Sequence, residues 1–356
     1  MSLKQMFARI LCGFSAFALC APFAGAQNAP AWVQDAAKAY PERDWVIGAA
    51  EAPDRRQAES AARSALAKAF KVDVKSVTNA MQSFSQSLSG GKGSYAQNQS
   101  LKSQIDTSSD VAGLMGVLLD VWAAPSGTVY ACARMNRKDG AATYAAIIRQ
   151  NDKTIATLVD GASAADAPFA AYELCNFAYS IAALTDNYLN ILSVLDSNAR
   201  RSLTVGYGNA AAVRARAMNA ASGIVINLEV RVTMPRDIAG LQTLDAERIA
   251  KPFQQVFTKR RFKTSVTNTD APYTLAVDFT LDTVDLAGNP NKFTRYVLKA
   301  ALLDRWGDEV MSFQDSKRSG HTSISEAAQR SIRDAEEAIA GAGFAKAFDA
   351  YLGSLL

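Results

Sequence analysis

Few side chains in this sequence offer catalytic or metal-binding chemistry. The 356 residues include a single histidine, His321, and four cysteines. Because histidine and cysteine are the usual zinc ligands, this scarcity excludes a histidine-rich metal site, an H-E-x-x-H metalloprotease and a zinc ribbon. We therefore expect neither a metal ion nor a cofactor.

His321 lies in a polar segment just before a predicted helix, shortly after Asp315, Lys317 and Arg318. A catalytic histidine needs a nucleophile and an orienting acid within reach, and the sequence has no G-x-S-x-G nucleophile motif. We expect His321 to be a loop residue and expect no catalytic residues. A small-ligand contact or a hydrolase site near His321 stays open as the alternative.

A second motif, G-x-G-x-x-A at residues 206–211, falls between a predicted strand and a predicted helix. In a dinucleotide-binding fold such glycines let the backbone approach a pyrophosphate, and an acidic residue ends the next strand. Glu229 has the right spacing but lies inside the predicted strand 224–232. We interpret the motif as a glycine-lined turn where a helix packs on a strand.

The remaining charged groups predict no ion or nucleic-acid site. Five carboxylates are scattered over strands and turns without the order of a calcium loop, so we expect them to face solvent; they are Asp278, Asp282, Asp285, Asp304 and Asp308. Residues 259–261 (Lys-Arg-Arg) are the densest basic cluster. They are typical of a solvated helix end, with a phosphate or lipid headgroup as the alternative ligand. The basic and aromatic interleaving of nucleic-acid binding proteins is absent.

Residues 1–26 read as a secretory signal peptide. Lys4 and Arg9 precede an apolar stretch over residues 10–23, and residues 24–26 (Ala-Gly-Ala) form a cleavage site. Two alternatives are a lipoprotein signal with Cys20 as the lipidated residue, and an uncleaved anchor. The remaining chain has no other run of 18 apolar residues, so we expect a soluble or peripheral mature protein. Cleavage would remove two positive charges from the net charge of +4.

Cleavage after residue 26 would leave two cysteines, Cys132 and Cys175. In an oxidising compartment they could form a disulfide. The alternative is a pair of buried free thiols.

The pattern over residues 28–138 predicts a mixed helix-and-sheet domain. We expect a short strand at 45–48 and an alanine-faced helix at 55–70. A polar hairpin, 71–88 and 98–110, follows; its turn contains Gly90, Gly91 and Lys92, and we expect it to project into solvent as an interaction element. A second hairpin, 111–122 and 128–135, turns at residues 124–127.

Residues 139–200 predict an antiparallel helical hairpin with a loop at 161–168. Apolar residues recur at alternating spacings of three and four in its second helix: Leu174, Phe177, Ile181, Leu184, Tyr188, Ile191 and Leu195. We expect this seam to pack on the preceding helix, through Tyr144, Ile148, Ile155 and Val159. Pairing with a second copy, giving a homo-oligomer, is the alternative.

Residues 201–356 predict a C-terminal α/β domain. We expect a short strand at 203–205, helices at 209–221 and 244–260, and strands at 223–233, 272–282, 293–304 and 308–316. Two helices close the chain, the first with a Ser323–Glu326 capping box and the second with Phe344, Phe348 and Leu352 on its inner face. The fold class expected is therefore α+β, with two mixed domains joined by the helical hairpin.

Residues 28–150 resemble the LPP-twenty lipoprotein family of bacterial envelope proteins. The segments that carry the resemblance are Pro30-Ala31-Trp32, residues 45–50 (WVIGAA), the alanine-rich helix to Phe70, residues 120–122 (DVW) and residues 127–135 (GTVYACARM). The family implies a secreted or outer-membrane-associated, non-enzymatic protein, in some members linked to flagellar or surface assembly. Residues 17–20 (FALC) depart from the family's lipidation motif.

Residues 203–356 resemble, in element order, periplasmic domains such as the TolB amino-terminal domain and penicillin-binding-protein activators. Neither resemblance supplies catalytic residues. We expect a non-enzymatic binding or assembly protein of the periplasm or outer membrane. Its partners would be envelope proteins or the outer membrane, through peripheral or lipid-anchored association.

Overall fold

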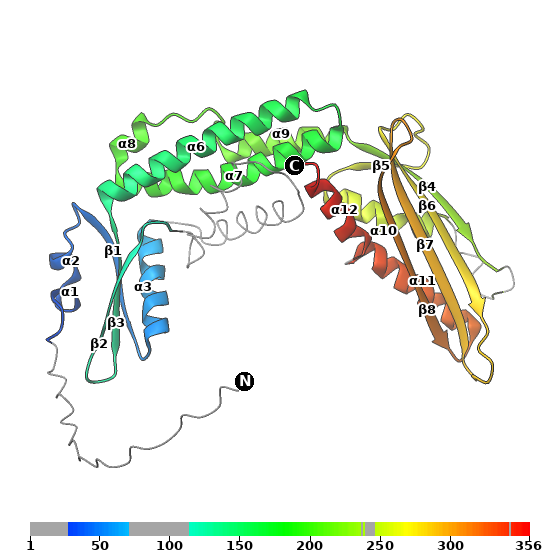
Figure 1. Cartoon of the computed structure of the whole chain (residues 1–356), viewed down its shortest axis with the longest axis horizontal. Coiled ribbons are helices and arrows are strands. Elements are labelled where there is room, and N and C mark those ends of the chain that lie inside the picture. Colours follow the sequence, from blue (N-terminus) through cyan, green and yellow to red (C-terminus); the bar gives the residue numbers. More distant parts are fainter. Residues whose placement is uncertain (1–27, 71–113, 236–237, 239–245, 342) are drawn as a thin grey trace, which may run out of the picture.

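The computed structural model describes residues 28–70, 114–235, 238, 246–341 and 343–356. The predicted signal peptide, Cys20, and the polar hairpin with Gly90, Gly91 and Lys92 lie outside the described residues. The described chain is α+β, as the sequence predicts, with two separate sheets. Figure 1 shows the sheets at opposite ends of a pair of long helices.

The first sheet is a small antiparallel one with the strand order β1-β3-β2. Two short helices, α1 (Ala31–Gln34) and α2 (Ala36–Ala39), precede its strands, which are β1 (Trp45–Ala52), β2 (Leu118–Ala123) and β3 (Val129–Asn136). The predicted turn at 124–127 is confirmed, because the Gly127 amide donates to the Ala124 carbonyl and Gly127 has a φ of 90°.

Helix α3 (Arg55–Ala69) packs on this sheet at backbone contact distance. A Cβ built on Gly48 of β1 would lie 2.2 Å from the Leu66 nitrogen and 2.6 Å from the Ala62 oxygen. Asp54 caps the helix by accepting from the Gln57 amide at 2.9 Å. Alanines on the inner face, such as Ala58 and Ala62, are fully buried, so the small residues let the helix approach the strand.

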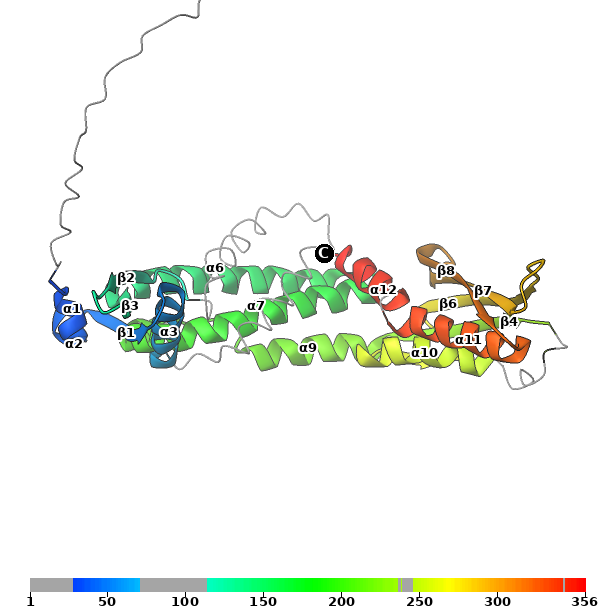
Figure 2. The same ribbon diagram turned by 90° about the horizontal axis from the view of Figure 1, so that it is seen from below.

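The predicted helical hairpin is confirmed as α6 (Arg137–Ala164) and α7 (Pro168–Leu195). Six of the seven predicted seam residues are buried, and Leu174 is partly buried. The loop predicted at 161–168 is wrong in extent, because α6 continues through Gly161 to Ala164. Helix α8 (Ser197–Ser202) follows, and α9 (Ala210–Gly223) lies along α7 (Figure 2), where Val213 packs with Phe177.

The second sheet has the order β5-β4-β6-β7-β8, parallel among β5, β4 and β6 and antiparallel from β6 to β8. Its strands are β4 (Val225–Thr233), β5 (Lys263–Ser265), β6 (Tyr273–Val284), β7 (Lys292–Asp304) and β8 (Glu309–His321). The short strand predicted at 203–205 is not formed, and β8 extends five residues beyond the predicted end at 316.

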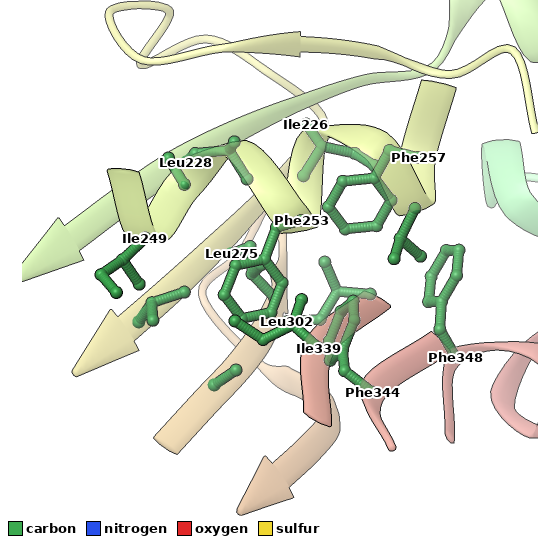
Figure 3. Close-up of a cluster of buried hydrophobic side chains, with 14 of the residues drawn as sticks. Ile226, Leu228, Ile249, Phe253, Phe257, Leu275, Leu302, Ile339, Phe344 and Phe348 are labelled. Atoms are coloured by element: carbon green, nitrogen blue, oxygen red, sulfur yellow. The ribbon is translucent and has the colours of Figure 1, made fainter. Parts of the chain in front are cut away.

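Three helices cover one face of this sheet: α10 (Ala246–Lys259), α11 (Ile324–Ala340) and α12 (Phe344–Gly353). Figure 3 shows Phe253 and Phe257 of α10 near Phe344 and Phe348 of α12. The rings of Phe253 and Phe344 meet edge to face with centroids 4.7 Å apart. Ser323 caps α11, as the sequence predicts, because the Glu326 amide donates to the Ser323 hydroxyl at 3.2 Å, which is one of the two bonds of a capping box.

Each end of the hairpin is built into the core of one sheet. At one end, Tyr144 and Leu195 belong to the same buried cluster as Met135 of β3. At the other end, Phe169 belongs to the core of the five-stranded sheet, stacked on Tyr273. With 28 residues in each helix, the hairpin spans about 42 Å.

The disulfide considered for Cys132 and Cys175 is not formed; both are buried free thiols. Cys132 lies in β3, whose last residues pack near Leu195 at the end of α7. Cys175 lies twenty residues before Leu195 on the same helix, which is about 30 Å along its axis. A disulfide requires Cα atoms within about 7 Å, so these thiols are too far apart to pair.

Candidate functional site

A surface cleft lies where the three-stranded sheet meets the hairpin, and we call it the hairpin-base cleft. Its volume is about 920 Å³, which is within the range of ligand-binding clefts. The lining residues come from five segments of the fold: the turn before β1 with its first residue, the end of β3, the first four turns of α6, the end of α7 and the start of α8. Of the predicted site residues, the three that the structure describes, Cys132, Cys175 and His321, do not line this cleft.

Half of the fourteen residues that line the cleft are charged. They are the cations Arg43, Arg137, Lys138 and Arg149 and the carboxylates Asp44, Asp139 and Asp196. The carboxylate of Asp196 accepts the amides of Asn198 and Ala199 at 2.9 and 3.0 Å, so it caps α8. Asp44 accepts from the Nε of Arg43 at 3.0 Å. Two of the three carboxylates therefore already have partners.

Arg137 holds the base of the cleft together. Its Nε donates to the Glu42 carbonyl at 2.7 Å, and its Nη1 donates to the Val194 and Leu195 carbonyls at the end of α7. A cation at a helix C-terminus is favoured by the helix dipole. Its partners are carbonyls, so no carboxylate offsets its positive charge in these contacts.

One face of α6 forms a wall of the cleft. Lys138, Ala142, Ala145 and Arg149 follow one another at spacings of four, three and four, so they lie on one side of the helix. Lys138 and Arg149 are exposed and have no ion-pair partner within the described residues. The wall therefore has a cation at each end and small side chains between them.

Trp45, another lining residue, is held in place by a polar cluster behind it. The guanidinium of Arg134 lies 4.8 Å from the Trp45 ring centroid and 4.7 Å from that of Tyr40. Its Nε donates to Asp120 at 2.6 Å, and the Tyr40 hydroxyl donates to the same carboxylate at 2.7 Å. The hydrogen bond from Arg134 lowers the pKa of Asp120, while burial and the Asp120 contact raise the pKa of Tyr40 to about 12.

His321 lies at the end of β8, far along the chain from the cleft. It pairs with Lys292 of β7, and its Nδ1 lies 3.4 Å from the Thr322 hydroxyl. The polar groups named with it have other partners. Tyr296 donates to Asp315, and Lys317 pairs with Asp334 at 2.9 Å. The Arg318 guanidinium lies 5.6 Å from the Phe293 ring centroid. The structure thus pairs Asp315, Lys317 and Arg318 with residues other than His321.

The glycine motif at residues 206–211 is occupied by the protein's own carboxylates. The Gly206 amide donates to Asp152 of α6 at 2.8 Å, and the Ala210 amide donates to Asp186 of α7 at 2.9 Å. The Tyr207 hydroxyl also donates to Asp186, at 2.7 Å. These amides at the start of α9 are the groups that would bind a pyrophosphate. The motif instead anchors α9 on the hairpin, and it does not follow a strand.

The basic cluster at residues 259–261 is likewise only partly solvated. Arg260 pairs with Asp349 of α12, and its guanidinium lies 5.5 Å from the Phe348 ring centroid. Arg260 also donates to the Val256 carbonyl at 2.8 Å. Its charge is therefore used inside the C-terminal unit.

A buried acid, Glu173, went unnoticed in the sequence. It is 6% exposed, on α7 where the hairpin enters the second core. Burial, with a smaller effect of Asp349, raises the pKa of Glu173 to about 7, while a hydrogen bond from Asn176 and the charge of Arg260 oppose this rise. A charged residue among the apolar positions of residues 169–181 was the available signal.

Among the described residues, no group of three or more histidine, cysteine or acidic side chains could hold a metal ion. The same part of the chain contains no helix that is both long and apolar enough to cross a membrane.

No family model matches this chain, and no curated protein matches it. The resemblance to the LPP-twenty family therefore stays a prediction. Two bacterial proteins are among the similar solved structures. A minor lipoprotein from Acinetobacter baumannii is 15% identical, with a TM-score of 0.24, over 36% of this chain and 91% of that chain. A secreted protein from Helicobacter pylori is 12% identical, with a TM-score of 0.35, over 82% of this chain and 96% of that chain.

Proposed function

We propose that this chain is a non-enzymatic scaffold of the bacterial envelope that holds two binding modules at a fixed separation. The module at one end is the three-stranded sheet with α3, and the module at the other end is the five-stranded sheet with α10, α11 and α12. The predicted signal peptide supports a location in the periplasm or at the outer membrane.

The observation that carries the proposal is the way in which the hairpin joins the modules. A flexible linker would leave their separation variable, whereas here both ends of the hairpin are packed into hydrophobic cores. Leu195 packs near Met135 and Gly140 at one end, and Phe169 contacts Tyr273, Phe262 and Phe348 at the other. A rigid spacer of about 42 Å is useful to a protein that arranges partners.

The rigidity can be measured by pulsed electron paramagnetic resonance. Spin labels would be placed on cysteines at Lys68 of α3 and Lys299 of β7, which are both exposed. Cys132 and Cys175 are buried and would stay unlabelled. A single narrow distance distribution is expected. A broad distribution would contradict a spacer function.

The scaffold role is tested by chemical cross-linking of the mature protein in intact envelopes, followed by mapping of the linked peptides. Cross-links to envelope components from both modules are expected. An insertion of seven residues in each hairpin helix keeps the packing register and changes the spacing by about 10 Å. It should remove the cross-links of one module. An equal insertion in the turn at residues 286–290 is the control and should leave them unchanged. Recovery of no protein, membrane or wall component would count against the proposal.

A further inference from the structure

The charged side chains that line the hairpin-base cleft differ in whether they have an ion-pair partner. Asp44 is paired with Arg43, whereas Asp196 accepts two backbone amides of α8 and keeps its negative charge. Lys138 and Arg149 are exposed and have no ion-pair partner within the described residues, and Arg137 contacts carbonyls rather than carboxylates. The lining carries four cations against three carboxylates, which leaves an excess of one positive charge. The cleft therefore attracts negative charge.

The two exposed cations are spaced along one helix face. Lys138 and Arg149 are eleven residues apart, which corresponds to about 16 Å along α6. The exposed Ala142 and the buried Ala145 lie between them, so no large side chain fills the wall between the two cations. When both side chains extend straight out from the helix, a ligand that contacts both cations carries two negative groups at about this separation. In an extended peptide, this separation corresponds to about five residues.

The spacing of Lys138 and Arg149 distinguishes between single anions, dense polyanions and acidic polypeptides as ligands. A single phosphate or carboxylate can contact only one end of the wall. A dense polyanion would meet the lining carboxylates Asp44, Asp139 and Asp196, and like charges in contact are repulsive. A polypeptide with two separated acidic side chains satisfies both cations and avoids this repulsion.

We propose that the hairpin-base cleft binds an acidic segment of a partner protein, in which two carboxylates about five residues apart contact Lys138 and Arg149. This proposal rests on the proposed scaffold function and gives the chemical class of one of its partners. The fixed position of the cleft, where the first module meets the hairpin, would orient that partner relative to the second module.

The experiment is a selection of peptides from a random twelve-residue phage library on the full mature protein. Sequences that still bind the double variant Lys138→Glu/Arg149→Glu are removed by counter-selection. Glutamate at Lys138 lies in the first turn of α6, where a negative charge suits the helix dipole, so the variant should fold. Thermal melting checks this, and Lys138→Gln/Arg149→Gln is the milder second variant. Lys251→Glu, an exposed lysine on α10, is the control for the charge change.

Enriched peptides should carry two acidic residues four to six positions apart. Isothermal titration should show affinity at least about tenfold weaker for the double variant, equal affinity for Lys251→Glu, and weakening with salt. Enriched peptides without acidic residues, or equal binding by folded double variant and wild type, would overturn the proposal. So would an affinity for phosphatidylglycerol vesicles or inorganic phosphate that is lost in the double variant while no acidic peptide is enriched.

The result is distinct from the test of the scaffold function. If envelope cross-links form from both modules but the cleft selects no acidic peptide, the scaffold function stands and this inference fails. If acidic peptides bind but the two modules give no envelope cross-links, peptide binding by the cleft stands and the scaffold function fails.

Discussion

The Phe169 ring, in the first turn of α7, stacks on the Tyr273 ring at the start of β6, with centroids 4.0 Å apart and planes 27° from parallel. Phe169 is fully buried and also meets Phe262 and Phe348 edge to face. A residue of the hairpin is thus a central residue of the second core. The contact couples the direction of the hairpin to that of the five-stranded sheet.

Phe169→Ala should therefore weaken both the stability and the rigid joint. Removal of a fully buried phenylalanine typically costs about 3–5 kcal/mol. Urea unfolding should show this loss, and the distance distribution between labels at Lys68 and Lys299 should broaden below the unfolding transition. Phe169→Leu, which keeps most of the apolar volume, is the control. A narrow distribution in folded Phe169→Ala would show that the other contacts fix the joint.

Glu173 should make stability fall as the pH rises. Its carboxyl group titrates near pH 4.5 in the unfolded chain, and burial raises its pKa to about 7 in the folded chain. Below pH 4.5 the Glu173 carboxyl is protonated in both the folded and the unfolded chain. Between about pH 4.5 and 7 only the unfolded chain loses the proton, so this group costs up to about 3 kcal/mol at higher pH. The charges that face it are Arg260 and Asp349, and this pair bears on its titration too.

Glu173→Gln should flatten this pH dependence and raise the free energy of unfolding at pH 8 relative to pH 5. Urea unfolding at both pH values is the measurement. Glu247→Gln, at an exposed glutamate on α10, should leave the slope as in the wild type. An unchanged slope in Glu173→Gln would show that Glu173 ionises normally in the folded protein.

Asp186 should be required for the docking of α9. It accepts hydrogen bonds from the Ala210 amide and the Tyr207 hydroxyl at 2.9 and 2.7 Å. Hydrogen bonds to a charged group contribute about 1.5–3 kcal/mol each. Asp186→Ala should speed amide hydrogen exchange throughout α9, as measured by mass spectrometry. Asp160→Ala, at an exposed position on α6, should not change it. If the exchange of α9 is the same in both variants, the apolar contacts of Val213 suffice to hold the helix.

Local patterns in the sequence predicted most of the elements. The hairpin seam, the alternation of β6 and β7, and the Ser323 cap all depend on residues close in the chain, where periodicity and capping preferences act. The errors occurred where a local signal was weak. Gly161 suggested a loop, but it lies inside α6, where packing of the helix outweighs the low helix propensity of one glycine. Residues 203–205 found no partner strand, so their strand preference had no effect.

The candidate site could not be predicted from the sequence, because it is made by long-range contacts. Arg137 contacts Val194, 57 residues away, and no local pattern joins the lining segments of the cleft. The glycine motif misled for a related reason. Free amides near a helix start bind any anion. Here that anion is the carboxylate of Asp152, which lies 54 residues from Gly206 in the chain.

Cys132 and Cys175, the two cysteines that remain if the predicted signal peptide is cleaved, should both react as free thiols. Burial raises the pKa of Cys132 to about 11 and also raises that of Cys175. Because the thiolate is the reactive form, the folded protein should react with Ellman's reagent much more slowly than the same protein in guanidinium chloride. Full reaction in denaturant should count two thiols. A mass two daltons lower, with no reaction, would indicate a disulfide and a different arrangement of β3 and α7.

Gly48→Ala should be among the most damaging single substitutions in the first module. The added methyl group would lie 2.2 Å from the Leu66 nitrogen and 2.6 Å from the Ala62 oxygen, and both are backbone atoms that cannot rotate away. Helix α3 would have to move off the sheet, which would open the contacts of Ala58 and Ala62. Overpacking of this kind typically costs about 1–3 kcal/mol and sometimes more.

Gly127→Ala, at the turn before β3, is the matched comparison: it has open space but a φ of 90°, so it should cost only about 1 kcal/mol. Thermal unfolding of the two variants should rank Gly48→Ala as the less stable, and the reverse order would mean that α3 does not pack on β1 at backbone contact.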